Sequence, residues 1–303
     1  MAAPGAGEAV LLACDWGTTN LRAWTLDAAG AMVAQQDFAL GVSRLGPGEA
    51  GRRFEAEVRP ALAAQALPAI LCGMVGSNLG WRAAPYADCP AGLPELAQRL
   101  TTVADGVRIV PGLRCEGLAG APDVMRGEET QLVGWLALNP ERRSGRHLVC
   151  HPGTHAKWVL IEDGRIARFV TVMTGELFAV LSQHSVLKSP APADDEAAFD
   201  AGVAAAGEGD GLAARLFTAR ARVVGGGASA ESTPSYLSGL LIGAEVASAP
   251  KLLGEDPRSL SLLGDAALCE RYRRALARRG VAVEVFDGEA AAIAGLFALG
   301  APA

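Results

Sequence analysis

The feature that most constrains the fold is a strand, turn and strand pattern at residues 11–24, LLACDWGTTNLRAW. An apolar run of strand length ends at the carboxylate of Asp15, and an alternating strand resumes after a short polar turn, which predicts a hairpin. Gly17 lets a phosphate approach the backbone, and successive N–H groups and two hydroxyls can line an anion-binding concavity. Asp15 at the strand end suits a magnesium ion. The alternative is an ordinary hairpin whose polar turn faces solvent.

The second half of the chain repeats this pattern without repeating its residues. A strand predicted at 147–150 is followed by a Gly-Thr turn in the segment HPGTHAKW and by a strand that ends at Ile161. The chain has 303 residues, which exceeds a typical domain with a single core. The polar run RRSGR at 142–146 is the best boundary. We therefore predict two α/β domains, residues 1–145 and residues 146–303.

A glycine-rich loop at 73–81, GMVGSNLGW, directly follows a short apolar strand predicted at 69–72. The loop combines three glycines with Ser77, Asn78 and Trp81. Loops that leave the carboxyl ends of sheet strands are common ligand-binding sites in α/β proteins. We interpret this loop as a ligand site, and the alternative is a glycine-rich turn anchored by the tryptophan.

Charged residues gather at the start of a helix that ends before Asn139-Pro140. Glu128 and Glu129 lie in its first turn, where carboxylates also simply favour the helix dipole. Arg126 precedes them, and a planar guanidinium is the preferred partner of a carboxylate or a phosphate. The segment is therefore a candidate for substrate binding and for proton transfer.

The remainder of the chain is predicted to be largely helical. A helix begins at Thr233-Pro234 and carries Gly239 and Gly243 four residues apart, a spacing that permits close approach by another helix or by a flat ligand. A later strand, 260–263, meets a turn at Gly264.

Composition excludes several classes of protein. The formal net charge is −6 and there is no basic tail, which argues against a nucleic-acid partner. No window approaches the roughly 20 apolar residues that span a bilayer, so we expect no membrane association. Six cysteines without C-x-x-C pairing indicate reduced thiols, and we expect a cytoplasmic protein.

Six motifs share their order and spacing with a known family. They read DWGTTNLRAW, GMVGSNLGW, MRGEETQL, PGTHAKWV, MTGELF and SGLLIGAEVAS. On these motifs the sequence closely resembles the 2-dehydro-3-deoxygalactonokinase family, from about residue 10 to the C-terminus. The resemblance implies two related actin-like ATPase (ribonuclease H-like) domains with a nucleotide cleft between them. It also implies transfer of the γ-phosphoryl group of ATP, with Mg²⁺, to the terminal 6-hydroxyl of 2-dehydro-3-deoxy-D-galactonate in galactonate catabolism.

The resemblance also assigns residues to the sites of such a kinase. Asp15 matches the magnesium partner. The nucleotide-binding set is Gly17, Thr18, Thr19, Asn20, Gly153, Thr154, His155, Lys157, Gly239, Gly243 and Gly264. The substrate-binding set is Ser77, Asn78, Trp81, Arg126 and Arg44, in which Arg126 is the first choice for the sugar-acid carboxylate and Arg44 the second.

Phosphoryl transfer needs a group near the attacking hydroxyl. We expect Glu128 to be this base, with Glu129 and Asp123 as rivals. Two other functions stay open: a phosphohydrolase that resembles exopolyphosphatases, and a nucleotide-switched interaction protein. The epimeric 2-dehydro-3-deoxygluconate is the alternative substrate, and a homodimer is the assembly we consider.

Overall fold

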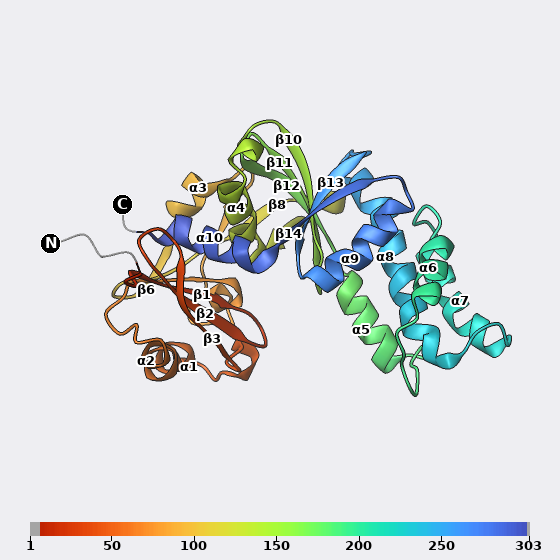
Figure 1. Ribbon diagram of the computed structural model, residues 1–303, viewed down its shortest axis with the longest axis horizontal. Coiled ribbons are helices and arrows are strands. Elements are labelled where there is room, and N and C mark those ends of the chain that lie inside the picture. The colour runs from red at the N-terminus through yellow and green to blue at the C-terminus, as the bar shows by residue number, and fades with distance from the viewer. Residues whose placement is uncertain (1–6, 302–303) are drawn as a thin grey trace. The chain divides into compact units, whose positions relative to one another are not determined.

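The computed structural model describes residues 7–301, which divide into two compact units (Figure 1). The first unit contains the chain up to Arg146, the segment Ile161–Ala167 and the C-terminal segment from Gly288. The second unit contains His147–Leu160 and Arg168–Asp287. The first change of unit lies after Arg146, one residue beyond the predicted boundary at 145/146, and the two later segments of the first unit lie within the predicted second domain.

The first unit is built on a six-stranded sheet of order β3-β2-β1-β4-β7-β6. Strand β1 pairs antiparallel with β2 and parallel with β4, and β4 pairs parallel with β7. The central strands read as nearly continuous apolar runs because both faces of the sheet are covered there. The six strands are β1 Leu11–Trp16, β2 Leu21–Leu26, β3 Met32–Phe38, β4 Ala69–Cys72, β6 Thr101–Ala104 and β7 Val107–Ile109.

Two helices pack against one another beside this sheet, α4 Glu128–Leu138 and α10 Gly288–Gly300 (Figure 1). They approach closely at two glycines. A β-carbon at Gly134 would lie 1.8 Å from Ala291 O, and one at Gly295 would lie 2.0 Å from Thr130 O. Helix α10 also contacts β1 and β4, so the last helix of the chain completes the core of the first unit.

The helical segment from residue 49 to residue 61 is irregular. It consists of α1 Glu49–Arg53, a π-helical turn Phe54–Val58 and α2 Arg59–Ala61. Pro60 lacks the N–H that a continuous α-helix would use, and the chain leaves helical geometry at Leu62. The buried Arg59 side chain then donates to Ala64 O at 2.7 Å and stabilises the turn that follows.

A small sheet between residues 86 and 125 was not predicted from the sequence. It has the order β5-β8-β9, in which β5 pairs parallel with β8 and β8 pairs antiparallel with β9. Its elements are β5 Tyr86–Asp88, β8 Gly112–Glu116 and β9 Pro122–Met125, and α3 Leu93–Ala97 follows β5. Strand β9 leads directly into the segment that carries Arg126 and α4.

The second unit contains most of a five-stranded sheet of order β12-β11-β10-β13-β14. This order matches that of the first five strands of the first sheet, β3-β2-β1-β4-β7. Its strands are β10 Arg146–His151, β11 Ala156–Glu162, β12 Arg165–Val172, β13 Ser259–Gly264 and β14 Ala282–Asp287. The repeated strand order confirms the predicted α/β fold with two related sheets of the actin-like ATPase type.

Helix α8 is the centre of the helical part of the second unit, and α5, α6, α7 and α9 contact it (Figure 1). The bounds are α5 Thr174–His184, α6 Glu196–Ala205, α7 Leu212–Val224, α8 Thr233–Leu252 and α9 Ala266–Ala277. Helix α8 begins at Thr233, as predicted, and Ser232 occupies its N-cap. Short 3₁₀ turns lie at Val42–Arg44, Gly73–Gly76, Leu118–Gly120, Pro140–Arg143 and Ala230–Ser232.

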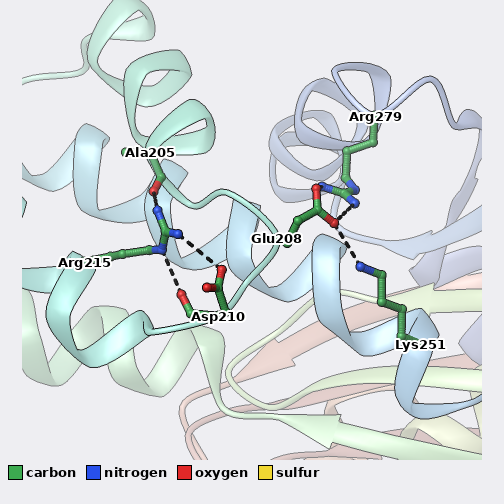
Figure 2. A network of polar contacts seen from close by, with 6 residues as sticks. All are labelled: Ala205, Glu208, Asp210, Arg215, Lys251 and Arg279. Atoms are coloured by element: carbon green, nitrogen blue, oxygen red, sulfur yellow. Dashed lines mark hydrogen bonds and ion pairs between the residues drawn. The ribbon is translucent and has the colours of Figure 1, made fainter.

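The loop between α6 and α7 is fixed to the helices around it by charged side chains (Figure 2). Glu208 accepts hydrogen bonds from Lys251 at 2.9 Å and from Arg279 at 3.0 Å, near the ends of α8 and α9. Arg215 on α7 donates to Ala205 O at 2.8 Å and to Asp210. These ion pairs lower the pKa of the exposed Glu208 carboxyl to about 2.

Candidate active site

Asp15 lies near the end of β1, opposite Cys72 of the parallel strand β4. Its Oδ2 accepts from Arg22 Nη2 at 3.0 Å, and the Cys72 thiol lies 3.8 Å from Oδ1. The Asp15 side chain is only 18% exposed. Burial raises the pKa of its carboxyl, while Arg22 lowers it and the charge of Glu128 raises it further. The Asp15 carboxyl and the Glu128 carboxylate therefore influence one another at the end of the sheet where β1 and β4 finish.

Two glycines allow the backbone to pass close to Asp15. Gly73 follows β4 with φ +87°, and a β-carbon there would lie 3.2 Å from Asp15 Oδ1. Gly127 precedes α4 with φ +112°, and a β-carbon there would lie 3.4 Å from Gly73 Cα. Side chains at either position would meet a neighbour in a backbone conformation that favours glycine. These two close backbone contacts place the start of α4 next to the Asp15 carboxylate at the end of β1.

The two glutamates in the first turn of α4 have different surroundings. Glu128 is half-buried, and its Oε2 accepts from the Arg126 backbone N–H at 3.1 Å. Glu129 is fully buried, and burial together with the charge of Glu128 raises the pKa of its carboxyl to about 8. Asp123 lies on β9, where its Oδ1 accepts from Val124 N at 2.8 Å. Of the three candidate bases, Glu128 combines partial exposure with an electrostatic effect on Asp15.

The Arg126 guanidinium lies between an aromatic ring and the backbone. Its Cζ is 4.4 Å from the centre of the Tyr86 ring, and Nη2 donates to Ala84 O at 2.7 Å. A β-carbon at Gly76 would lie 2.8 Å from Nη1. Nε and Nη1 are buried and have no hydrogen-bond partner among residues 7–301. Unsatisfied buried donors on a cation are costly, so this position favours an anionic partner.

The carbonyl groups of the turn after β1 accept hydrogen bonds from the backbone of the segment that follows β3. Gly41 N, Val42 N and Ser43 N donate to the carbonyls of Thr19, Gly17 and Thr18 at 3.0, 3.1 and 3.1 Å. The turn borders a cavity of about 540 Å³ lined by Asp15, Gly17, Thr19, Asn20, Arg22, Asp37, Phe38 and Ala39. Arg44 is exposed in the 3₁₀ turn that holds these carbonyls.

Arg22 was not singled out in the sequence. It lies on β2 and bridges two acidic residues, Asp15 at 3.0 Å and Glu289 of α10 at 3.4 Å. Its position directly after the polar turn, on an alternating strand, is the signal that could have identified it. A cation is thus fixed at the wall of the cavity described above.

The turn after β10 has an open backbone. A β-carbon at Gly153 would meet nothing within 4 Å, and Thr154 O accepts from Glu176 N at 3.0 Å. His155 contacts the Glu176 carboxylate. Lys157 is buried on β11, and its Nζ donates to Thr171 at 2.9 Å.

The turn after β13 lies beside the turn after β10, because the two strands run parallel. A β-carbon at Gly264 would lie 3.7 Å from Pro152 O. Asp265 caps α9 by accepting from Leu268 N at 2.9 Å. Two adjacent turns therefore line one edge of the second sheet.

Some predicted site residues have structural contacts instead. A β-carbon at Gly239 would lie 2.0 Å from Phe199 O, and one at Gly243 would lie 2.8 Å from Ala206 Cβ. Helix α6, and not a ligand, makes the close approach at both glycines. We therefore leave Gly239 and Gly243 out of the proposed nucleotide site.

The loop after β4 has mixed contacts. The Trp81 ring packs 5.5 Å from the Phe54 ring and borders an open cavity of about 730 Å³ on the α1 side of the first unit. Ser77 Oγ accepts from Leu79 N at 3.2 Å, and Asn78 is exposed. Ser77 and Asn78 follow the Gly73–Gly76 turn, whereas Trp81 contributes to the core of this unit.

Residues 7–301 contain no group of three or more His, Cys, Asp or Glu side chains arranged to hold a metal ion. Within the same residues no helix has both the length and the apolar character needed to cross a membrane. All six cysteines are free thiols.

The repeated sheets and the turns after their first strands define an α/β protein of the actin-like ATPase fold. A family model described as 2-keto-3-deoxy-galactonokinase matches residues 15–299. The chain belongs to the 2-keto-3-deoxy-galactonokinase family, which confirms the resemblance drawn from the six motifs.

Individual relatives agree with this family. The chain is 39% identical over 287 residues to the 2-dehydro-3-deoxygalactonokinase of Escherichia coli strain K12, covering 94% of this chain and 95% of that protein. It is also 39% identical over 295 residues to a probable 2-dehydro-3-deoxygalactonokinase of Rhizobium meliloti, with the same coverage. A crystal structure of a candidate 2-dehydro-3-deoxygalactonokinase from Sinorhizobium meliloti superimposes with a TM-score of 0.84 at 39% identity, covering 95% of this chain and 97% of that one.

Proposed function

We propose that this chain transfers the γ-phosphoryl group of ATP to the 6-hydroxyl of 2-dehydro-3-deoxy-D-galactonate. Family membership supports the reaction, and one observation carries the assignment of residues. Asp15 lies against Gly73 at one end of the Gly73–Gly76 turn, Arg126 lies against Gly76 at the other end, and Gly127 before Glu128 packs on Gly73. Asp15, Glu128 and Arg126 therefore all lie next to the Gly73–Gly76 turn. A sugar acid needs carboxylates near its reacting hydroxyl and a cation near its own carboxylate.

Glu128 is the proposed base. The sugar oxygen forms a bond to the γ-phosphorus, the bond from that phosphorus to the β,γ-bridging oxygen breaks, and ADP leaves. Glu128 accepts the hydroxyl proton as this happens. Its carboxylate is half-buried and is oriented by the Arg126 backbone N–H at 3.1 Å, so it is positioned before the substrate binds.

The Asp15 surroundings fit a magnesium ion. Mg²⁺ is commonly bound through one or two carboxylates, substrate phosphates and several waters, so a single protein ligand suffices. Asp15 borders the cavity of about 540 Å³. Burial and the charge of Glu128 disfavour its ionised form, Arg22 favours it, and a bound cation would favour it further. When bound, the ion would neutralise charge on the transferred phosphoryl group. Gly17, Thr19 and Asn20 line the same cavity and would contact the nucleotide.

Arg126 is the proposed partner of the substrate carboxylate. Its Nε and Nη1 lack partners among residues 7–301 and are buried, so the proposed contact with carboxylate oxygens requires the segment that covers them to move when the substrate binds. The Tyr86 ring on one side restrains the guanidinium. Such a contact would select sugar acids over neutral hexoses, which have no carboxylate to offer.

A coupled assay of ADP release over a panel of sugars tests this function. The panel contains 2-dehydro-3-deoxy-D-galactonate, its gluconate epimer, and glucose and galactose as neutral controls. We expect the fastest ADP release with the galactonate, little with the hexoses, and slow ATP hydrolysis without sugar. Activity restricted to a hexose would overturn the substrate. Release of inorganic phosphate at the same rate with and without sugar would indicate a phosphohydrolase instead.

A further inference from the structure

The Glu129 carboxyl lies beneath the proposed site and has no role in the mechanism above. It is fully buried in the first turn of α4. Its Oε2 accepts from Gly127 N at 2.7 Å, and its Oε1 accepts from the Thr130 hydroxyl at 3.1 Å. Both oxygens are therefore occupied by the protein, and no substrate hydroxyl can reach them in this arrangement.

The same carboxyl is connected to Asp15 through two buried side chains. The Cys72 thiol lies 3.8 Å from Asp15 Oδ1. Burial raises the pKa of this thiol, and its interaction with the Thr130 side chain lowers it. Cys72 and Thr130 are both buried. A continuous polar path thus runs from the proposed magnesium ligand to the start of α4 inside an otherwise apolar core.

Gly127 is the part of this path that most needs an anchor. Its φ of +112° is a conformation that side chains rarely adopt, and it packs on Gly73 with no side chain of its own. The Gly127 peptide connects Arg126 with Glu128, so a shift here would move both proposed functional groups. The hydrogen bond from Gly127 N to Glu129 is what fixes that peptide on its buried side.

We propose that Glu129 is a positioning residue, whose buried carboxyl holds the Gly127 peptide and thereby keeps Glu128 in place beside Asp15. This inference rests on the proposed function, in which Glu128 is the base. It separates the roles of two adjacent glutamates that the sequence alone left as rivals. The first acts on the substrate, and the second orients the first.

Two substitutions at the same position test the proposal. E129Q keeps an oxygen that accepts from Gly127 N, and its amide NH₂ can donate to the Thr130 oxygen. Because burial raises the pKa of Glu129 to about 8, a neutral amide also resembles the protonated carboxyl. E129M keeps the approximate volume but removes the acceptor. We expect kcat within about threefold of the wild type for E129Q and a loss on the order of 100-fold for E129M, with the KM for ATP changed less than about threefold.

Glu95 provides a matched control in the same unit. Its Oε2 accepts from the N-cap amide of Gly92 at 2.8 Å in α3, so E95M removes a helix-capping carboxylate of the same kind away from the proposed site. We expect E95M to keep the wild-type kcat. Thermal unfolding of all variants reports whether each one folds. If E129M does not fold, T130V decides the test, with a kcat reduction of about fivefold or more expected.

Each outcome has a defined meaning. Wild-type kcat in folded E129M, or in T130V when E129M does not fold, overturns the role of Glu129 and leaves the proposed function intact. Loss of kcat in E129Q as large as in E128Q would make Glu129 a chemical participant and also overturns its positioning role. Absence of sugar-dependent ADP release by the wild type overturns the proposed function and this inference together.

Discussion

Arg126 illustrates how much one residue depends on surroundings that are distant in the sequence. Its guanidinium is restrained by Tyr86 of β5 and by Gly76 of the turn after β4, neither of which is near it in the chain. The sequence showed a cation beside two glutamates, which is a common surface pattern. The structure adds two buried nitrogens without partners among residues 7–301. That combination separates Arg126 from a solvated surface arginine and supports its proposed role in binding an anion.

Replacing Arg126 should therefore weaken sugar-acid binding more than nucleotide binding. A hydrogen bond to a charged group contributes about 1.5–3 kcal/mol, so R126Q should raise the KM for the sugar acid by about 10- to 100-fold. The KM for ATP should change little, which steady-state kinetics with each substrate varied in turn would show. R44Q is the matched control, since Arg44 is the exposed second choice. An increase in R44Q with none in R126Q would transfer the assignment to Arg44.

The proposed role of Glu128 as the base leads to a second prediction. E128Q removes the proton acceptor while keeping the oxygen that accepts from Arg126 N, so it should fold normally. General-base catalysis contributes about 10²- to 10⁴-fold, and we expect kcat to fall within that range. ATP affinity, measured by calorimetry, should stay within about threefold of the wild type. Undiminished turnover in E128Q would exclude Glu128 as the base.

The turns that follow β1 and β10 are the elements to which the proposed function assigns nucleotide binding. Gly17 and Gly153 do not require glycine for structural reasons. A β-carbon at Gly17 would meet only Asn20 O at 3.6 Å, and one at Gly153 would meet nothing within 4 Å. Any effect of a methyl group at these positions should therefore come from a ligand that approaches the backbone.

We expect G17A and G153A each to raise the KM for ATP by about tenfold or more, with a melting temperature close to that of the wild type. G227A is the control, because a β-carbon there would meet only Arg222 O at 3.5 Å, in the loop between α7 and α8. Its KM for ATP should be unchanged. A wild-type KM in G153A would remove the turn after β10 from the nucleotide site.

The elements that sequence reasoning identified are those whose signals are local. Apolar runs interrupted by Gly-Thr turns predicted β1, β2, β10 and β11 because strand period and turn chemistry both lie within a dozen residues. The small sheet was missed because β5 has three residues and pairs with β8, more than twenty residues further along. Helix α10 lies in the part of the chain that was predicted to be largely helical, but its packing on Gly134 of α4 depends on contacts that no local pattern records.

The same distinction applies to the candidate site. Asp15, Glu128 and Arg126 were recognisable by residue type and by their place at element ends. Two features of the site depend on segments that are distant in the sequence. One is the burial of Glu129, and the other is the pair of contacts that Arg22 makes with Asp15 and Glu289. For Gly239 and Gly243 the sequence could not choose between two readings, because their spacing fits close approach by a ligand or by a helix. In the structure, α6 and the residue after it occupy the space beside both glycines.

At the scale of the molecule, two acidic groups of the second unit should shape stability in opposite pH ranges. Glu208 has a folded pKa lowered to about 2 by Arg279 and Lys251, so its stabilising effect is present above its usual pKa of 4.5 and is lost as pH falls toward 2. Glu245 is buried on α8, where it accepts from Trp158 and Tyr272 at 2.7 Å each. Burial raises its pKa from 4.5 to about 7. Its favourable contribution is present below pH 4.5 and is lost as pH rises to 7.

These two effects predict maximum stability of the second unit near pH 4.5, where the Glu208 contribution is nearly complete and the loss of the Glu245 contribution begins. The ionised Glu245 should cost on the order of 3 kcal/mol above pH 7, since each unit of pKa shift corresponds to about 1.4 kcal/mol. Melting temperatures measured from pH 3 to pH 9 should therefore rise and then fall. E208Q should flatten the acidic limb, while E245Q, whose amide can still accept from Trp158, should flatten the limb between pH 4.5 and 7. A wild-type profile in E245Q would mean that this carboxyl ionises in the folded protein as freely as in the unfolded chain.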